Sequence, residues 1–342
     1  QGLEAAAEKV PLAIVGGGSK RFYGRTVEGT PLPIGDHAGI VSYEPKELVI
    51  TARAGTSLSE LEGVLAEQGQ ALPFEPPYFD TTATLGGMVA AGISGPARAY
   101  AGSVRDHVLG VRLLNGNGEL LRFGGEVMKN VAGYDISRLV TGSLGALGVI
   151  LEVSLKVLPQ APQELTLVRE CTATVALELM NRWAAQPLPL SATCHDGQRL
   201  WTRLSGSQQA VDAARAELGG DAVHDGAVFW WDLREHLHPF LKDSEKPLWR
   251  LSVRSATPPL GLGTEWIDWG GAQRWLRSDR IGEEIRQAAI SAGGHALQFR
   301  GGDRNGEVFH PLPAPLAHLH RRLKHAFDPQ GLFNPGRMYA AI

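Results

Sequence analysis

The segment PLAIVGGGSK, residues 11–20, places an apolar strand directly before three consecutive glycines. A glycine-rich turn exposes a row of backbone N–H groups, and such a concave row of donors can bind phosphate. A plain tight turn is the alternative, and it is the commoner structure for one such loop taken alone. The segment therefore predicts a strand over 11–15, followed by a candidate phosphate cradle made of Gly16, Gly17, Gly18, Ser19 and Lys20.

The common nucleotide motifs do not fit this loop. A dinucleotide fingerprint that starts Gly16-x-Gly18 needs a glycine at position 21, which is Arg21. No Gly-Lys-Ser or Gly-Lys-Thr sequence occurs, so a Walker A loop is also missing. The usual NAD and ATP motifs are therefore excluded.

A second glycine-rich stretch is longer. It runs from TLGGMVAAG at 84–92 through SGP at 94–96 to GSVRD at 102–106. So many small residues in a row let the backbone approach a bulky polyphosphate or planar group, or pack directly on other backbone. The hydroxyl groups here are candidates to hydrogen-bond phosphate oxygens. A helix cap or an ion pair is the alternative role for Asp106.

A third stretch joins KNVAGYD at 129–135 to TGSLGALGVI at 141–150. Its last glycine, Gly148, directly precedes a strand whose alternating pattern runs from Leu147 to Val157. That strand stops at Pro159, and the composition changes there, because all eight tryptophans follow this point. We expect a domain boundary near Pro159.

The bulk composition is that of an ordinary globular protein. The 342 residues carry a net charge of −3, with 43% hydrophobic and 20% charged residues, which favours two domains and gives no sign of nucleic-acid binding. No apolar run is long enough to cross a membrane. The chain has two cysteines, Cys171 and Cys194, so a reducing cytoplasm is expected and a four-cysteine iron–sulfur cluster within the chain is excluded.

Local signals predict several further elements. Ser57 and Glu60 form a capping-box pattern before a helix that Gly69 should end, and Asn115-Gly116-Asn117-Gly118 predicts a hairpin. Further helices are expected at 175–183, 208–218 and 282–292, and strands at 48–52 and 248–253. An amphipathic helix is expected from Leu316, Leu319, Leu323 and Phe327.

The three glycine-rich stretches, in this order, resemble the FAD-binding family of the vanillyl-alcohol-oxidase and p-cresol-methylhydroxylase (PCMH) type. The details GGMVA, GSVRD, KNVAGYD and the closing FNPGR resemble the FAD-binding subunits of bacterial glycolate oxidases, and the likeness covers essentially the whole chain. The resemblance implies an α+β fold. It consists of a two-subdomain PCMH-type FAD-binding domain at 1–158, an α/β cap domain with an antiparallel sheet at 159–312, and a helix and tail at 313–342 that return to the FAD domain.

The resemblance also implies the residues that hold FAD. The loop at 16–20 would cradle the diphosphate, and the tail would come back to the flavin. The expected contacts are Gly16, Gly17, Gly18, Ser19, Lys20, Thr84, Leu85, Gly86, Gly87, Ser94, Gly95, Gly102, Ser103, Asp106, Gly148, Ile150, Asn334 and Arg337. Many relatives bind FAD covalently, through a histidine in the first glycine-rich loop. Here that position reads Gly18-Ser19, so we expect non-covalent FAD.

The cap offers two candidate catalytic residues, Arg250 and His295, and no identifiable catalytic base. Relatives that oxidise 2-hydroxy acids often carry two histidines seven residues apart for a metal, but His295 is followed seven residues on by Gly302, so no metal site is expected. A structural role is the preferred interpretation of His295. Arg250 and Arg254 should share one face of a strand, where an arginine fork suits a carboxylate. A salt bridge or subunit interface is the preferred alternative for them.

Three functions remain open. The first is a subunit of a multi-chain glycolate oxidase, in which a hydride passes from glycolate to flavin and the electrons pass to a second flavin subunit and an iron–sulfur subunit. The second is a self-sufficient FAD-dependent 2-hydroxy-acid dehydrogenase. The third is a non-catalytic scaffold that holds FAD. We expect a cytoplasmic protein, and membrane association through partners stays open.

Overall fold

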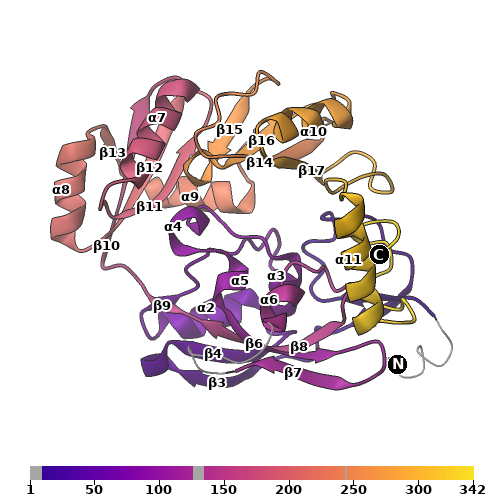
Figure 1. Ribbon diagram of the computed structural model, residues 1–342. Helices are drawn as coiled ribbons and strands as arrows, with labels where there is room; N and C mark the ends of the chain where they lie inside the picture. The colour runs from indigo at the N-terminus through magenta and orange to yellow at the C-terminus, as the bar shows by residue number, and fades with distance from the viewer. Residues whose placement is uncertain (1–9, 126–134, 243–244) are drawn as a thin grey trace.

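A computed structural model describes residues 10–125, 135–242 and 245–342. Two sheets lie one above the other, with helices between and around them (Figure 1). The chain is an α+β protein, as the sequence predicted. The part of the KNVAGYD motif at 129–134 lies outside the described residues.

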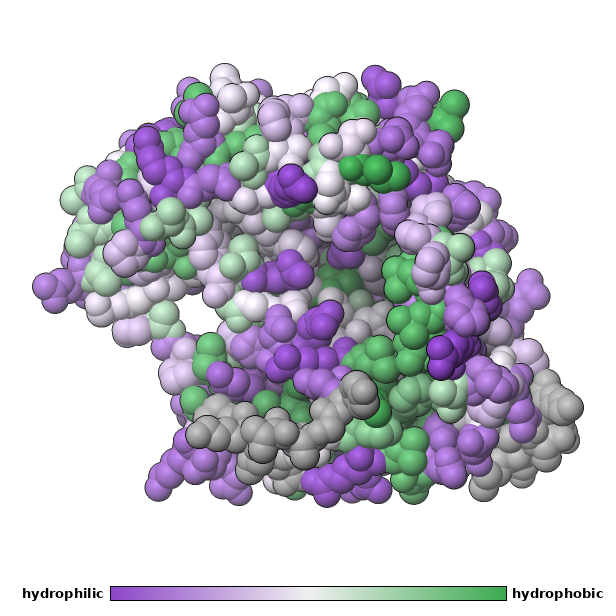
Figure 2. Space-filling model, viewed as in Figure 1, coloured by the Kyte–Doolittle hydropathy of each residue, from purple (hydrophilic) through white to green (hydrophobic). Residues whose placement is uncertain are grey.

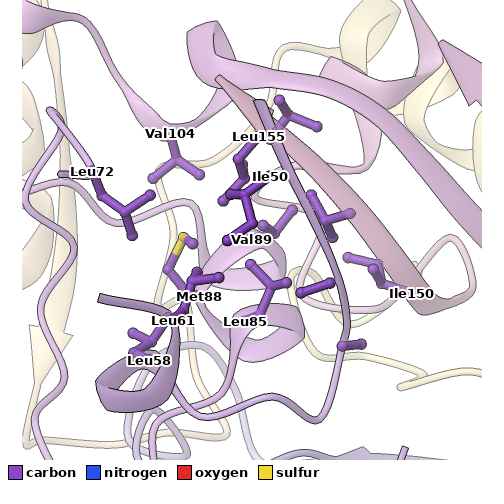
Figure 3. Close-up of a cluster of buried hydrophobic side chains, with 14 of the residues drawn as sticks. Ile50, Leu58, Leu61, Leu72, Leu85, Met88, Val89, Val104, Ile150 and Leu155 are labelled. Carbon is purple, nitrogen blue, oxygen red and sulfur yellow. The ribbon is translucent and has the colours of Figure 1, made fainter. Parts of the chain in front are cut away.

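The lower sheet has five strands in the order β3-β4-β8-β6-β7, and every neighbouring pair is antiparallel. Its strands are β3 (Ile40–Glu44), β4 (Val49–Arg53), β6 (Val108–Leu114), β7 (Leu120–Gly124) and β8 (Val149–Lys156). The helices above it are α2 (Leu58–Ala66), α3 (Leu85–Ala91), α5 (Val104–His107) and α6 (Ile136–Val140). Leucine, valine and methionine side chains from these helices close the core against the sheet (Figure 3).

Short-range chemistry explains several boundaries in this half. The Ser57 hydroxyl accepts a hydrogen bond from the Glu60 N–H at 3.1 Å, which starts α2 as predicted. The helix ends at Ala66, three residues before Gly69. The Asn115 side chain accepts hydrogen bonds from the backbone N–H groups of Asn117 and Glu119, and this closes the predicted hairpin between β6 and β7.

A small parallel sheet carries the first glycine-rich loop. It pairs β1 (Leu12–Val15) with β2 (Thr30–Pro33), and the C-terminal tail joins it, because Leu12 bridges to Phe333. The remaining short elements of this half are η1 (Pro45–Glu47), β5 (Gln70–Ala71), β9 (Leu158–Pro159) and α4 (Arg98–Ala101).

The upper sheet has eight strands in the order β13-β10-β12-β11-β15-β16-β14-β17. They are β10 (Gln163–Glu170), β11 (Leu190–His195), β12 (Arg199–Gly206), β13 (Asp221–Val223), β14 (Leu248–Ser252), β15 (Glu265–Asp268), β16 (Gln273–Arg277) and β17 (His295–Arg300), with η2 (Trp269–Gly271) between β15 and β16. The outer face packs against α7 (Ala173–Ala184), α8 (Gln208–Leu218) and α10 (Gly282–Ser291).

The inner face of the upper sheet meets α9 (Gly226–Glu235) and the lower half of the molecule in one shared core. Trp230, Trp266 and Trp275 from the upper half pack there with Tyr23 and Ile93 from the lower half. The tryptophan enrichment after Pro159 therefore supplies bulky apolar surface at the junction of the two halves.

The strand at 248–253 is one residue shorter than expected, and this corrects the idea of an arginine fork. Because β14 ends at Ser252, Arg254 lies beyond the strand, and only Arg250 occupies a ladder position. Gly294 packs against the Ser252 carbonyl, where an added Cβ would lie only 1.9 Å from that oxygen.

Helix α11 (Ala314–Phe327) and the tail return to the lower half as expected (Figure 1). The buried ammonium of Lys324 donates to the carbonyls of Ala146 and Phe333 and to Asp328. Only part of the apolar face of α11 is buried, because Leu316 and Leu319 are 41% and 48% exposed. Hydrophobic surface lies beside α11 in Figure 2.

None of the helices in the described ranges combines the length and the hydrophobicity that crossing a membrane requires.

Candidate functional site

A cavity of about 450 Å³ lies in the lower half, between the loop after β1, helix α3 and the C-terminal tail. Most of the residues expected to hold FAD line it. They are Gly16, Gly17, Gly18, Ser19, Lys20, Thr84, Gly86, Gly87, Gly148, Ile150, Asn334 and Arg337. Segments from four distant parts of the sequence therefore meet around a single cavity.

The backbone of the glycine loop lies so close to the backbone at Thr82 that a side chain at Gly17 has no room. An added Cβ at Gly17 would lie 1.4 Å from the Thr82 carbonyl oxygen, and the Thr82 hydroxyl donates to the Gly17 carbonyl at 2.6 Å. Gly18 has a φ of +78°, which side-chain-bearing residues rarely adopt. The backbone N–H groups of residues 16–20 donate to no acceptor among the described residues. A row of unused donors at a cavity wall is the arrangement expected of an anion cradle.

Four cations line the same cavity: Lys20, Arg21, Arg304 and Arg337. No aspartate or glutamate is among the described residues that line it, and none of the four makes an ion pair within the described ranges. Burial lowers the pKa of Lys20 to about 8, against a smaller opposing effect of Glu235. Burial also lowers the pKa of Arg304 to about 10, and Arg337 adds to that shift. Four cations without a carboxylate among the described lining residues give an excess of positive charge, which fits an anionic ligand.

The tail fixes the far wall of the cavity. The buried Asn334 accepts a hydrogen bond from the Ile14 N–H at 2.8 Å and donates to the Leu144 carbonyl at 2.7 Å. The Arg337 guanidinium donates to the carbonyls of Arg25 and Arg21. The closing FNPGR motif is therefore tied by side-chain hydrogen bonds to both the first strand and the third glycine-rich stretch.

Six residues expected at the cofactor do not line the large cavity. Leu85, the first residue of α3, is fully buried in the core of the lower half. Ser94 and Gly95 line a second, small cavity at the junction with the upper sheet. Gly102, Ser103 and Asp106 line neither cavity. There the Asp106 carboxylate accepts from the Ser103 N–H and hydroxyl in a capping box that starts α5, as its alternative interpretation held.

Sequence reasoning missed several cavity residues. Gly145 and Leu144 lie within the third glycine-rich stretch, so the composition already pointed to them. Arg304 had no signal, because it follows β17 in a loop that only the tertiary fold brings to the cavity. Its guanidinium donates twice to the Gly24 carbonyl, at 2.7 and 3.1 Å.

The two candidate catalytic residues, Arg250 and His295, lie on the paired strands β14 and β17. Arg250 lines the small second cavity, and its guanidinium donates to the Tyr23 hydroxyl at 3.3 Å. His295 is exposed at the start of β17, with its ring centre 6.1 Å from that of His310. Within the described ranges, no group of three or more histidine, cysteine or acidic side chains is arranged to hold a metal ion.

Comparison with known proteins gives a consistent picture. A family model for an FAD binding domain matches residues 3–124. The chain is 50% identical over 340 residues to the glycolate oxidase subunit GlcE of Escherichia coli (strain K12), covering 99% of this chain and 95% of that protein.

More distant relatives match less than half of the chain. The glycolate oxidase subunit GlcD of Bacillus subtilis (strain 168) is 30% identical over 38% of this chain and 27% of that protein. A D-lactate dehydrogenase of Anaerostipes hadrus is 32% identical over 44% of this chain and 32% of that protein. Among solved structures, an alkyldihydroxyacetonephosphate synthase superposes with a TM-score of 0.67 at 16% identity, covering 97% of this chain and 72% of the other, which indicates a shared fold.

Proposed function

The chain belongs to the family of the glycolate oxidase subunit GlcE, and from that premise we propose that it is the FAD-binding subunit of a multi-chain glycolate oxidase. The enzyme oxidises glycolate to glyoxylate. Bound FAD supplies the acceptor for the hydride that leaves the glycolate α-carbon. The residues of this chain would hold that acceptor and neutralise its charge.

One observation carries the proposal. The cavity combines the unused N–H groups of residues 16–20 with four cations and no lining carboxylate among the described residues. A diphosphate brings two negative charges and several acceptor oxygens, which satisfy both the donors and the cations. Gly16, Gly17, Gly18, Ser19, Lys20, Thr84, Gly86, Gly87, Gly148, Ile150, Asn334 and Arg337 are the residues we assign to FAD.

We propose a domain plan that the arrangement of the sheets supports. We place the FAD-binding domain at 1–158, because every strand of the five-stranded sheet precedes that limit. We place the cap at 159–312, which contains all of the eight-stranded sheet, and the returning helix and tail at 313–342.

We propose that FAD is bound non-covalently. No histidine, cysteine or tyrosine is among the described residues that line the large cavity, so the walls offer no side chain of the kinds that attach flavin covalently. Acid or heat should then release all of the flavin into solution.

We also propose two partners, a second flavin subunit and an iron–sulfur subunit. Cys171 and Cys194 are both free, and two thiols cannot ligate a four-cysteine cluster. We propose that the electrons that leave FAD pass to an acceptor on another chain. We place the complex in the cytoplasm, with any association with a membrane made through those partners.

Rebuilding the complex tests the function. The complex is assembled from its other subunits with either the FAD-loaded chain or the same chain stripped of flavin, and glycolate-dependent dye reduction is measured without oxygen. We expect activity only with the loaded chain, and recovery when FAD is added to the stripped one. Equal activity with a stripped chain that stays flavin-free throughout would show that the chain is a scaffold rather than a redox subunit.

A further inference from the structure

One of the eight tryptophans lies exposed on helix α9, which Figure 1 shows between the upper sheet and the lower half. Trp231 is 47% exposed, whereas each of the other seven is at most 8% exposed. Its neighbour Trp230 faces the upper sheet, where its indole N–H donates to the Thr166 hydroxyl at 2.9 Å. Successive residues of a helix lie about 100° apart around its axis, so Trp231 points away from that contact. A large apolar side chain left in water is a candidate for contact with another molecule.

Trp231 belongs to a small surface that we call the α9 patch. Ala227 and Val228 lie one turn earlier on the helix, and both are exposed, Val228 by 58%. Tyr78 of the lower half places its ring edge to face with that of Trp231, with 6.1 Å between the ring centres. The Arg234 guanidinium lies over both rings, 4.2 Å from the centre of Trp231 and 5.1 Å from that of Tyr78. Tryptophan, tyrosine and arginine are the residue types that dominate the binding energy of protein interfaces.

The polar groups of the α9 patch are fixed by contacts within the chain. The Arg234 Nε donates to the Glu235 carboxylate at 2.8 Å. The Tyr78 hydroxyl donates to the Glu62 carboxylate at 2.6 Å. Side chains that are held in place before binding lose less conformational entropy when a partner docks. The patch is therefore preorganised to contact another protein.

The α9 patch also adjoins the large cavity. The backbone N–H groups of Tyr78 and Phe79 donate to the carboxylate of Glu235, the last residue of α9, at 3.0 and 2.8 Å. The Tyr78 carbonyl accepts from the ammonium of Lys20 at 3.2 Å, and Lys20 lines the large cavity. A protein docked on the patch would therefore lie against the segment that supports the wall of the cavity we assign to FAD.

The charge around the α9 patch is negative. Asp225 directly precedes α9, Asp232 follows Trp231, and Asp80 lies two residues after Tyr78. None of these three aspartates makes an ion pair within the described ranges. The positive charge of Arg234 is already matched by Glu235. An apolar centre with an acidic rim complements a partner that has basic residues around an apolar recess.

Building on the proposed function, we propose that the α9 patch docks the iron–sulfur subunit, the electron-accepting partner of that complex. The partner receives the Trp231 ring in an apolar recess and places lysine or arginine side chains opposite Asp225 and Asp232. A second copy of this chain would bring the same acidic rim to the contact, because a two-fold interface joins identical surfaces. An anionic membrane would be repelled for the same reason.

Binding of the FAD-loaded full chain to the purified iron–sulfur subunit tests the docking surface. Calorimetry without oxygen gives the dissociation constant. Trp231→Ala should weaken binding by about 30-fold or more, as expected for a central interface tryptophan. Val228→Glu places a carboxylate in the apolar centre and should also weaken binding. Ile281→Ala is the matched control, because Ile281 is 69% exposed beside α10 on the opposite face of the upper sheet, and it should bind like the parent.

The charge of the rim is tested by reversal. A chain with both Asp225→Lys and Asp232→Lys should bind the iron–sulfur subunit more weakly than the parent, and its affinity should depend less on salt. Circular dichroism and the flavin content show that each variant is folded and holds FAD, since none of the changed residues lines the large cavity. An affinity and a salt dependence equal to those of the parent would refute the role of the rim.

The outcomes separate the docking surface from the proposed function. Trp231→Ala and Val228→Glu chains that bind the iron–sulfur subunit as tightly as the parent would overturn the docking surface, and glycolate-dependent dye reduction in those complexes would leave the proposed function standing. Self-association of the chain, or binding to anionic vesicles, that Trp231→Ala abolishes would assign the patch to another occupant and overturn the inference. An assembly that depends on Trp231 but is equally active with a flavin-free chain would support the docking surface and overturn the proposed function.

Discussion

Replacing Gly17 by alanine should remove FAD from the chain. The added Cβ would lie 1.4 Å from the Thr82 carbonyl oxygen and 2.4 Å from its carbon, which are backbone atoms that cannot rotate away. To reach even 3.0 Å from that oxygen, the loop must retreat by about 1.6 Å. It would also strain the 2.6 Å hydrogen bond between the Thr82 hydroxyl and the Gly17 carbonyl.

The size of the effect follows from the contacts that such a shift breaks. A hydrogen bond to a charged group contributes roughly 1.5–3 kcal/mol, so losing two N–H contacts to the diphosphate costs about 3–6 kcal/mol. That corresponds to a loss of FAD affinity of at least about 100-fold. Flavin fluorescence quenching during titration of the stripped chain with FAD gives the dissociation constant directly.

Gly63→Ala is the matched control for Gly17→Ala. Gly63 lies within α2, has nothing within 4 Å of an added Cβ, and should gain about 1 kcal/mol of stability from better helix propensity. Its FAD affinity should equal that of the parent. If Gly17→Ala is folded and binds FAD within threefold of the parent, the loop at 16–20 is not the diphosphate cradle.

Three further predictions concern titration and the tail. FAD affinity should be highest below pH 8 and fall above it by up to about tenfold per pH unit. The reason is that Lys20 loses its proton near pH 8 in the free chain, while a bound diphosphate raises that pKa. Lys20→Met should bind FAD weakly at every pH, and a variant with the same pH profile as the parent would contradict this. The contribution of Asp268 to stability should fall by about 4 kcal/mol as the pH rises from about 4 to 7, because folding raises the pKa of Asp268 to about 7 and so favours its protonated form. The Asp268→Asn variant lacks this contribution, so the difference in stability between parent and variant in urea titrations should change by that amount over this pH range. A difference that does not change with pH would refute the assignment. Asn334→Ala should lower the free energy of unfolding by about 2–5 kcal/mol, because it leaves the Ile14 N–H and the Leu144 carbonyl unpaired in the interior. Calorimetry measures this loss, and a value below about 1 kcal/mol would mean that water replaces both contacts.

The sequence predicted the parts of the molecule whose signals are local. A strand running into consecutive glycines, a Ser57 cap and an Asn-Gly hairpin each depend on a few neighbouring residues, and the structure contains all three. The tail motif was also informative, because Asn334 and Arg337 do return to the cavity wall.

Features that depend on tertiary contacts were not predicted from the sequence. Arg304 reaches the cavity only because the upper sheet brings its loop to the Gly24 carbonyl. Arg254 leaves the ladder because the strand stops at Ser252. The segment from Gly102 to Asp106 was assigned to the cofactor on its resemblance to a motif, yet in the structure its polar groups satisfy one another at a helix start. Nothing in the neighbouring residues distinguishes the outcomes at Arg304 and Arg254, whereas a helix cap at Asp106 was already the alternative that its sequence allowed.

The most direct test of the central claim is the flavin content of the purified full chain. The visible spectrum is recorded after saturation with FAD and removal of the excess, and again on the supernatant after acid precipitation. We predict one FAD per chain, all of it in the supernatant, which is the result for a single non-covalent site. A chain that takes up no flavin under these conditions would contradict the assignment of the large cavity, and flavin that stays with the precipitate would contradict non-covalent binding.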